Sequence, residues 1–365
     1  MTARPSRRTT VGALALASLA LTGCGVDAPG TAPSGGAAGG STGGASSDVV
    51  VTGPDSVPEA DESEELAVAF FGFARANSFA SATWTGVQQY AEAHGATAEF
   101  FDPNFDAQTQ VSQIQDAVTT DRFDVFVVQA NDGQAVIPAV QSAVAAGITV
   151  VVEFTPVGTS YDTADPQVDG VITLIDVPTL NGEALGQLGL EACEDAGTDP
   201  CQVAYLEGFK TLPLDNARTE AARAALEEGG AQVVASVEGG YTNDSGRQAM
   251  QDVLQSNPDV DVVIGSTQAV AGAEGVVGDG VRLIGNGGSR QAVDAVREGR
   301  WFGAYCTPEV TAGETAAALG LAAARGESVP SSNSYDGLTP TGATWPEGML
   351  CTADTVDGVE GQYDE

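Results

Sequence analysis

The chain has 365 residues and a formal net charge of -36, with 50 acidic side chains against 14 Lys and Arg. Such a length is enough for two domains of ordinary size. The strong negative charge argues against nucleic acid and anionic lipid head groups as partners, because both would repel the protein. The sequence also holds one His, His94, and one Lys, Lys210, so His-centred catalysis and His-rich metal sites are not expected.

Residues 1–23 have the features of an export signal. Three arginines form a positive n-region, and the apolar run Val11–Leu21 that follows is too short for an ordinary membrane span. The segment ends in Leu-Thr-Gly-Cys at 21–24, which resembles a bacterial lipobox. We therefore expect cleavage before Cys24 and acylation of that residue, with palmitate-type chains holding the protein at the outer face of the cell membrane. A plain secretory signal with an incidental Cys is the alternative.

Residues 24–63 have the composition of a tether. They are rich in Gly, Ser, Ala, Thr and Pro and become acidic from Asp55 onward. Such a composition cannot bury a core, so the segment is predicted to be disordered. A flexible chain of about 40 residues has a root-mean-square reach of about 35 Å, enough to let an anchored domain sample a nearby membrane partner.

From Leu66 the pattern alternates between strands and helices. Leu66–Phe71 is an apolar run of strand length, which suits a parallel strand covered on both faces. A loop with Asn77 and Phe79 follows, and then apolar residues recur at helical spacing. Asp106 is placed to cap the next helix. Further strands are expected at 97–101, 124–129, 148–154 and 171–175.

A second alternating run occupies the rest of the chain up to Arg325. Strands are expected at 202–206, 232–237, 260–264, 281–284 and 301–305, with helices between them and a last helix over about 311–325. This order predicts an α/β fold with parallel sheets and helices on both faces. Residues 328–365 show no clear period and are expected to be mostly irregular, ending in an acidic tail.

Four cysteines remain after Cys24, and an even number in an exported chain favours two disulfides. Three pairings are possible. Pairing Cys193 with Cys201 is local and leaves Cys306 with Cys351; buried free thiols are the alternative. By the loop-entropy estimate, the short loop contributes about 2.5 kcal/mol and the long one about 4 kcal/mol.

Three local matches over about 260 residues point to a known family. They are the opening strand with Asn77-Ser78-Phe79 and Gly86; Tyr205-Leu206-Glu207-Gly208 with Asp215-Asn216-Ala217-Arg218; and Tyr241-Thr242 with Met250-Gln251 and Asn257-Pro258-Asp259-Val260. Their order and spacing resemble the bacterial periplasmic binding proteins of the ribose- and galactose-binding type, the solute receptors of ABC importers.

This resemblance implies two doubly wound parallel-sheet lobes, joined by three crossing segments, that close on a ligand. The first lobe is expected to hold residues 64–175 and 308–336, and the second 176–307 and 337–365. The resemblance further implies a monomer without a cofactor, whose partners are a small solute, an importer permease and, through the lipid, the membrane.

Sugars offer hydroxyls and flat C–H faces, so their sites need planar polar side chains and aromatic rings. On the matched positions, the resemblance implies a ligand site at the carboxyl ends of the strands. The expected ligand-binding residues are Asn77, Phe79, Gln129, Phe154, Arg218, Tyr241, Ser266 and Asn286.

Several of these residues also have a plain structural interpretation. Phe79 and Tyr241 fit a hydrophobic core, and Arg218 fits an ion pair on its helix with Asp215 or Glu220. Asn286 stands where the family has an Asp that binds the anomeric hydroxyls of a sugar. A less hydroxylated, more apolar or partly anionic ligand, with Arg218 as its counter-charge, is therefore an alternative to a standard sugar.

The pattern as a whole favours a lipid-anchored solute receptor that delivers a sugar or related polar molecule to an ABC importer. A ligand-presenting sensor module for a membrane signalling receptor is the alternative. An enzyme is not expected, because the sequence offers no Ser–His pair, no nucleophilic Cys with a His partner and no His-based metal cluster.

Overall fold

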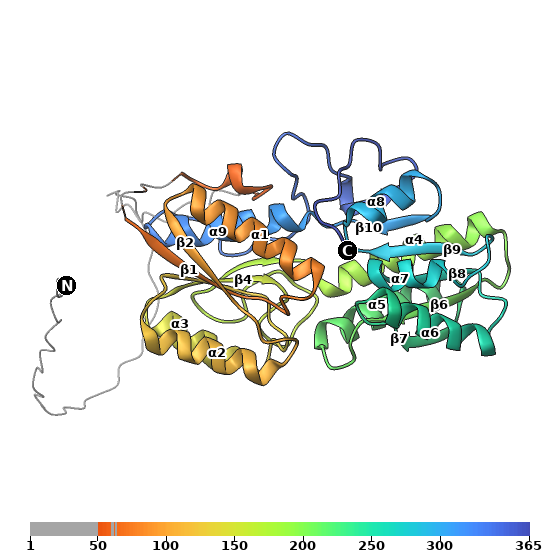
Figure 1. Ribbon diagram of the computed structural model, residues 1–365, viewed down its shortest axis with the longest axis horizontal. Coiled ribbons are helices and arrows are strands. Elements are labelled where there is room, and N and C mark those ends of the chain that lie inside the picture. The colour runs from red at the N-terminus through yellow and green to blue at the C-terminus, as the bar shows by residue number, and fades with distance from the viewer. Residues whose placement is uncertain (1–49, 60–61, 63) are drawn as a thin grey trace, which may run out of the picture. The chain divides into compact units, whose positions relative to one another are not determined.

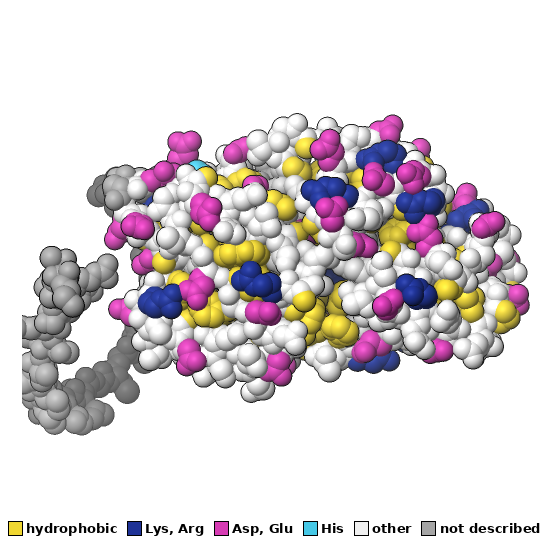
Figure 2. Space-filling view, in the orientation of Figure 1, with side chains coloured by type: hydrophobic (Ala, Val, Ile, Leu, Met, Phe, Trp, Pro, Cys, Tyr) yellow, Lys and Arg dark blue, Asp and Glu magenta, His cyan; other side chains and the backbone are white. Residues whose placement is uncertain are grey.

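The computed structural model describes residues 50–59, 62 and 64–365 (Figure 1). The expected export signal, Cys24 and most of the expected tether lie outside the described residues. Within the described part of the chain, every helix is too short or too polar to cross a bilayer. Acidic side chains are spread over the face shown in Figure 2, as the net charge of -36 requires.

The first lobe is built on a five-stranded parallel sheet with the order β2-β1-β3-β4-β5. Its strands are β1 (Leu66–Phe71), β2 (Ala96–Phe101), β3 (Val125–Val128), β4 (Thr149–Phe154) and β5 (Ile172–Ile175). Its helices are α1 (Ser78–Ala93), α2 (Ala107–Thr120), α3 (Ile137–Ala145) and α9 (Glu309–Ala324). Figure 1 shows α1 and α9 on one side of the sheet and α2 and α3 on the other.

Strand β1 shows why helices must pack on both faces of this sheet. Val68 and Phe70 join the core under α1 and α9, whereas Ala69 and Phe71 join a separate core with α2 and α3. Successive side chains of a strand point to opposite faces, and all four of these are fully buried. An unbroken apolar run is therefore what a two-sided parallel sheet requires.

The second lobe is built on a six-stranded sheet with the order β11-β10-β9-β8-β6-β7. Its strands are β6 (Gln202–Glu207), β7 (Gln232–Glu238), β8 (Val262–Ser266), β9 (Arg282–Asn286), β10 (Gly303–Tyr305) and β11 (Leu350–Thr352). Its helices are α4 (Pro178–Ala196), α5 (Pro213–Glu228), α6 (Asn243–Ser256), α7 (Thr267–Glu274) and α8 (Arg290–Arg297). All neighbouring strands are parallel except β11, which runs antiparallel to β10 at the edge.

The predicted fold class, two parallel-sheet lobes joined by three crossing segments, is confirmed. The chain passes between the sheets after β5, after β10 and before β11. The third crossing runs beside the first, because Ile175 accepts a backbone hydrogen bond from Tyr335 at 2.9 Å and donates one to Asn333 at 3.0 Å. The predicted cap of α2 is also present, since Asp106 accepts a bond from the Thr109 amide at 2.6 Å.

Helix α9 completes the first lobe although it comes late in the sequence. A Cβ added to Gly86 of α1 would lie 1.9 Å from the Val310 carbonyl oxygen, and one added to Gly313 of α9 would lie 2.0 Å from that of Thr83. The two helix backbones are therefore in direct contact, which only glycine permits at these positions.

The structure differs from the predicted tether over residues 50–59. Val51 and Val57 are 3% and 7% exposed, and a 3-10 helix, η1 (Pro54–Ser56), packs against α9. The Thr52 carbonyl accepts a bond from the Thr339 amide at 2.9 Å. The tether prediction was wrong here because Val51 and Val57 are buried and anchor this short segment on the first lobe.

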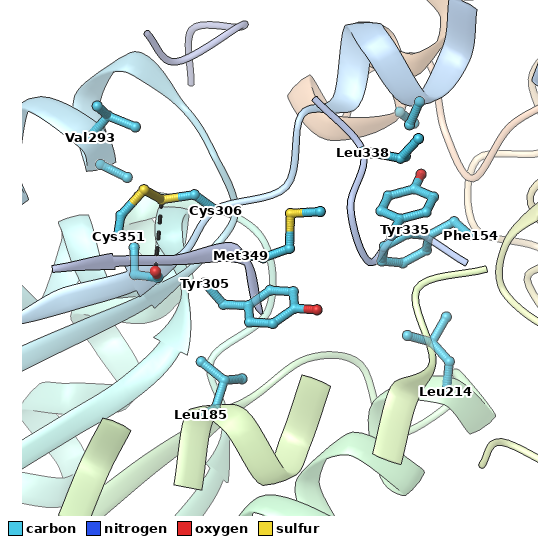
Figure 3. Close-up of a cluster of buried hydrophobic side chains, with 14 of the residues drawn as sticks. Phe154, Leu185, Leu214, Val293, Tyr305, Cys306, Tyr335, Leu338, Met349 and Cys351 are labelled. Carbon is cyan, nitrogen blue, oxygen red and sulfur yellow. Dashed lines mark hydrogen bonds between the residues drawn. A yellow bond between two sulfur atoms is a disulfide. The ribbon is translucent and has the colours of Figure 1, made fainter. Parts of the chain in front are cut away.

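Of the three possible pairings, the structure has the one that joins Cys193 to Cys201 and Cys306 to Cys351. Cys193 bonds to Cys201 with an S–S distance of 2.05 Å, and Cys306 bonds to Cys351. The second bond ties β10 to β11 beside Met349 and Tyr305, at the place where the chain leaves for α9 and returns (Figure 3).

Removing the second disulfide is expected to cost more stability than removing the first. The Cys306–Cys351 loop spans 45 residues and the Cys193–Cys201 loop 8. Loop entropy predicts losses of about 4 and about 2.5 kcal/mol for the two double Cys→Ala variants. Urea unfolding of both variants and the unmodified chain measures the difference. An equal or larger loss for the short loop would contradict the entropic account.

Candidate functional site

A cavity that is partly open to solvent lies between the strand ends of the two lobes. The empty space within it and at its mouth amounts to about 760 Å³. Residues of both sheets line it, among them Asn77 and Phe154 from the first lobe and Arg218 and Tyr241 from the second. The carboxyl ends of parallel strands, where such folds hold ligands, therefore meet at one cavity.

Aromatic rings form one wall of the cavity. Phe79 and Phe154 meet edge to face with ring centres 4.7 Å apart, and Phe105 of the first lobe lies parallel to Tyr241 of the second at 6.1 Å. Figure 3 shows Phe154 beside Tyr335, at a ring distance of 5.7 Å. These rings present the flat apolar surface that the C–H face of a sugar ring contacts.

Phe154 owes its position to a strained turn at the end of β4. Its φ of +61° lies in the left-handed region that non-glycine residues rarely adopt, and the Thr155 amide bonds to the Glu153 carbonyl across it at 2.7 Å. Such strain costs roughly 1–3 kcal/mol and gathers at functional sites. The turn places the Phe154 ring in the cavity wall.

Arg218 of α5 is the cation of the cavity. Its side chain is 9% exposed, and Nη1 and Nη2 lie 3.4 and 3.8 Å from carboxylate oxygens of Asp215 and Asp176. Its Nε and Nη2 make no hydrogen bond to any residue that the structure describes. The guanidinium centre also lies 5.8 Å from the centre of the Phe154 ring. Arg218 therefore keeps donor capacity in a site where two carboxylates already balance its charge.

The two carboxylates beside Arg218 are themselves held in place. Asp215 accepts bonds from the Tyr241 hydroxyl at 2.7 Å and the Phe209 amide at 2.8 Å. Asp176 accepts bonds from Tyr305 and Asn181. Burial raises the pKa of Asp176 to about 6 and the pKa of Asp215 above its usual range, while the nearby Arg218 lowers both. The Tyr241 hydroxyl thus already donates to Asp215, and the Tyr241 ring forms part of the cavity wall.

Four more of the predicted ligand residues line the cavity, and the polar groups of three of them already make hydrogen bonds within the protein. Asn77 Oδ1 caps α1 by accepting a bond from Ala80, which leaves its amide nitrogen. The Ser266 hydroxyl donates to the Gly240 carbonyl and caps α7. Asn286 exchanges bonds with Asn181 at 3.2 and 3.3 Å. Phe79 contributes its ring.

Gln129 is the predicted ligand residue that the structure places elsewhere. It is fully buried, is absent from the cavity lining, and donates to the Thr83 hydroxyl at 3.0 Å. It follows β3, a central strand whose end is covered by α1, so its side chain remains inside the first lobe. The expectation that it contacts ligand has no geometric support.

A buried acidic cluster lies behind the aromatic wall. The Tyr335 hydroxyl donates to Glu153 and lies 3.5 Å from Glu309, which also accepts a bond from Thr83 at 3.3 Å. Burial raises the pKa of Glu153 to about 7; burial and the Glu153 charge raise the pKa of Glu309 well above its usual range. Burial therefore favours the protonated form of both carboxyls.

Asp215, Gln268 and Tyr363 are among the cavity residues that the sequence reasoning missed. Asp215 is the first residue of the quoted motif that ends in Arg218, and it was considered only as the ion-pair partner of that arginine. Gln268 follows β8 and donates to Ser78 of the first lobe at 3.0 Å. Tyr363 belongs to the segment predicted to be irregular, where no pattern marked it. In the described chain, no group of three or more His, Cys, Asp or Glu side chains is arranged to hold a metal ion.

Two α/β lobes with one cavity between their strand ends define a two-lobed ligand receptor. The family described as "Periplasmic binding protein domain" matches residues 68–328, well over half of the chain. The protein therefore belongs to the periplasmic binding protein domain family. No curated protein matches the sequence.

Solved structures of similar fold include three solute-binding proteins of ABC transporters. One from Mycobacterium smegmatis with bound glycerol is 22% identical, with a TM-score of 0.68 over 83% of this chain and 100% of its own. One from Bacillus halodurans with bound myo-inositol is 19% identical, with a TM-score of 0.66 over 84% and 100%. One from Actinobacillus succinogenes with bound D-allose is 18% identical, with a TM-score of 0.64 over 80% and 100%. At these identities, the likeness shows the fold.

Proposed function

We propose that the protein is an extracytoplasmic solute-binding protein, anchored to the cell membrane through a lipidated Cys24. It captures a small polyhydroxy compound between its lobes and delivers that compound to the permease of an ABC importer. It acts as a monomer, needs no cofactor, and binds without chemical turnover. Family membership and the lipobox-like segment at 21–24 support the location and the partner.

The cavity supports this function through one observation above all. A buried guanidinium with spare donors, Arg218, lies against an aromatic wall to which both lobes contribute. Donors beside flat rings suit a molecule that has hydroxyls and C–H faces. We assign ligand contact to Asn77, Phe79, Phe154, Arg218 and Tyr241, with Ser266 and Asn286 shaping the site.

The charge balance favours a neutral ligand over an anionic one. Asp215 and Asp176 already face Arg218, so an incoming carboxylate would meet two acidic groups for one cation. The three related structures hold glycerol, myo-inositol and D-allose, all of them neutral polyols. We therefore propose a neutral sugar or cyclitol, in preference to the partly anionic ligand considered from the sequence.

A thermal-shift screen tests the proposal. Glycerol, myo-inositol, D-allose, D-ribose and D-galactose are compared with the anionic D-glucuronate. A ligand present at 100 times its Kd stabilises the folded state by about 2.7 kcal/mol. We expect at least one neutral compound to raise the Tm and to remain chemically unchanged in the NMR spectrum. Stabilisation by D-glucuronate alone, or conversion of the added compound, would contradict the proposal.

A further inference from the structure

The last residues of the chain are docked on the second lobe at the start of α8. The Tyr363 carbonyl accepts a bond from the Arg290 amide at 2.8 Å, and the Ser289 hydroxyl donates to the side chain of Glu365 at 2.8 Å. Arg290 also pairs with Asp364 at 2.9 Å. A Cβ on Gly361 would lie 2.5 Å from the Arg290 nitrogen. Residues 361–365, which we call the C-terminal tail, are therefore held in a fixed position on the second lobe.

The tail also reaches the first lobe. Gln362 accepts a bond from the Thr311 amide at 3.1 Å and donates to the Thr311 hydroxyl at 2.8 Å. Thr311 lies in the first turn of α9, just after the second crossing segment. The Gln362 side chain thus makes two hydrogen bonds to the first lobe, whereas the backbone of the tail is bound to the second lobe.

Between these two attachments, Tyr363 enters the wall of the cavity. It is 6% exposed and lines the cavity together with Asn286, Gln268 and Thr307. Its Oη is buried beside Gly287, where an added Cβ would lie 2.8 Å away, and no described residue makes a hydrogen bond of full geometry to it. Burial raises the pKa of Tyr363 well above its usual range, and the nearby Thr267 side chain and Gly288 backbone lower it, as groups that donate toward Oη do. The proton of the hydroxyl is therefore left without an acceptor in the described part of the chain.

We propose that the C-terminal tail is part of the ligand site, and that Tyr363 determines specificity by a hydrogen bond to a hydroxyl group of the bound polyol. This inference rests on the proposed function and adds a residue from outside the segment that matches the family. The tail holds the ring in place through Ser289 and Arg290, and Gln362 connects it to α9. The missing partner of the hydroxyl is then supplied by the ligand.

Isothermal titration of the full chain with glycerol, myo-inositol and D-allose tests the inference. Tyr363→Phe keeps the ring and removes the hydroxyl alone. Tyr161→Phe is the matched control, because Tyr161 also has a buried hydroxyl without a partner in the described chain but does not line the cavity. For each compound that the unmodified chain binds, we expect Tyr363→Phe to weaken binding roughly 10-fold and Tyr161→Phe to leave it unchanged.

The Tm of the ligand-free protein separates a binding role from a structural one. Because no described residue makes a hydrogen bond of full geometry to this hydroxyl, Tyr363→Phe should leave this Tm nearly unchanged while the affinity falls. A lower Tm with unchanged affinity, or a loss of affinity shared by Tyr161→Phe, would overturn the role of Tyr363. If the unmodified chain binds none of the five neutral compounds of the thermal-shift screen, the proposed function fails, and this inference fails with it.

Discussion

Arg218→Ala is expected to abolish binding of the neutral polyol that stabilises the unmodified chain. Each hydrogen bond from a charged donor contributes about 1.5–3 kcal/mol, so losing both spare donors of Arg218 weakens binding at least about 100-fold. The same change leaves Asp215 and Asp176 buried without the cation that both of them face. Breaking a buried ion pair on one side costs roughly 3–5 kcal/mol, so the urea midpoint should also fall markedly.

Two further variants separate these effects. Arg218→Lys keeps the positive charge between the two carboxylates but loses the planar fork, so it should recover most of the stability and little of the affinity. Arg223→Ala is the matched control on α5, since Arg223 is 45% exposed in a surface pair with Glu227 and should change stability by less than about 0.5 kcal/mol. Affinity of Arg218→Ala within twofold of the unmodified chain would refute the site assignment.

Stability is expected to fall as the pH rises from about 4.5 to about 7. Burial raises the pKa of Glu153 from 4.5 to about 7, so in this range the folded protein keeps a proton that the unfolded chain has released. The contribution is fully present below pH 4.5 and is lost as the pH passes the folded pKa. For a shift of this size the loss is roughly 3 kcal/mol. Asp176, with its pKa raised to about 6, acts in the same direction.

Glu153→Gln isolates the contribution of this one carboxyl. Glutamine can still accept the bond from Tyr335 but carries no charge at any pH, so the variant should match the unmodified chain near pH 5 and exceed it near pH 8. Urea unfolding at both pH values measures the slope. The control is Glu99→Gln, because Glu99 is 45% exposed and pairs with Arg122 at the surface. The account is wrong if Glu153→Gln and the unmodified chain lose the same stability between pH 5 and pH 8.

The fold was predictable from the sequence because parallel strands covered on two faces must be apolar throughout. Leu66–Phe71 and residues 148–154 stood out for this reason. Strand ends were less certain: the strand expected at 301–305 begins at Gly303, and the one expected at 260–264 became Val262–Ser266. The short β11 could not be seen, because its pairing with β10 depends on a return from the other lobe and on the Cys306–Cys351 bond.

The site was predictable where a residue lies at the carboxyl end of a strand or in the connection that follows it. Phe154 ends β4, Asn77 and Phe79 lie at the start of α1 after β1, and Arg218 came from a motif. Gln129 also follows a strand, but a local pattern does not tell which side chains a neighbouring helix will cover. Tyr363 depends on where an irregular tail docks, which no periodicity encodes.

The late position of α9 has a consequence for how the chain must be made. Until residues 309–324 have been synthesised, Val125 of β3 and Val151 of β4 lack the helix that covers them. A fragment ending near residue 305 would contain every strand of the first lobe and still expose part of one side of its sheet. Such surfaces promote aggregation, so truncated products should be insoluble, and the first half of the polypeptide should reach its final form only after the last fifth has emerged.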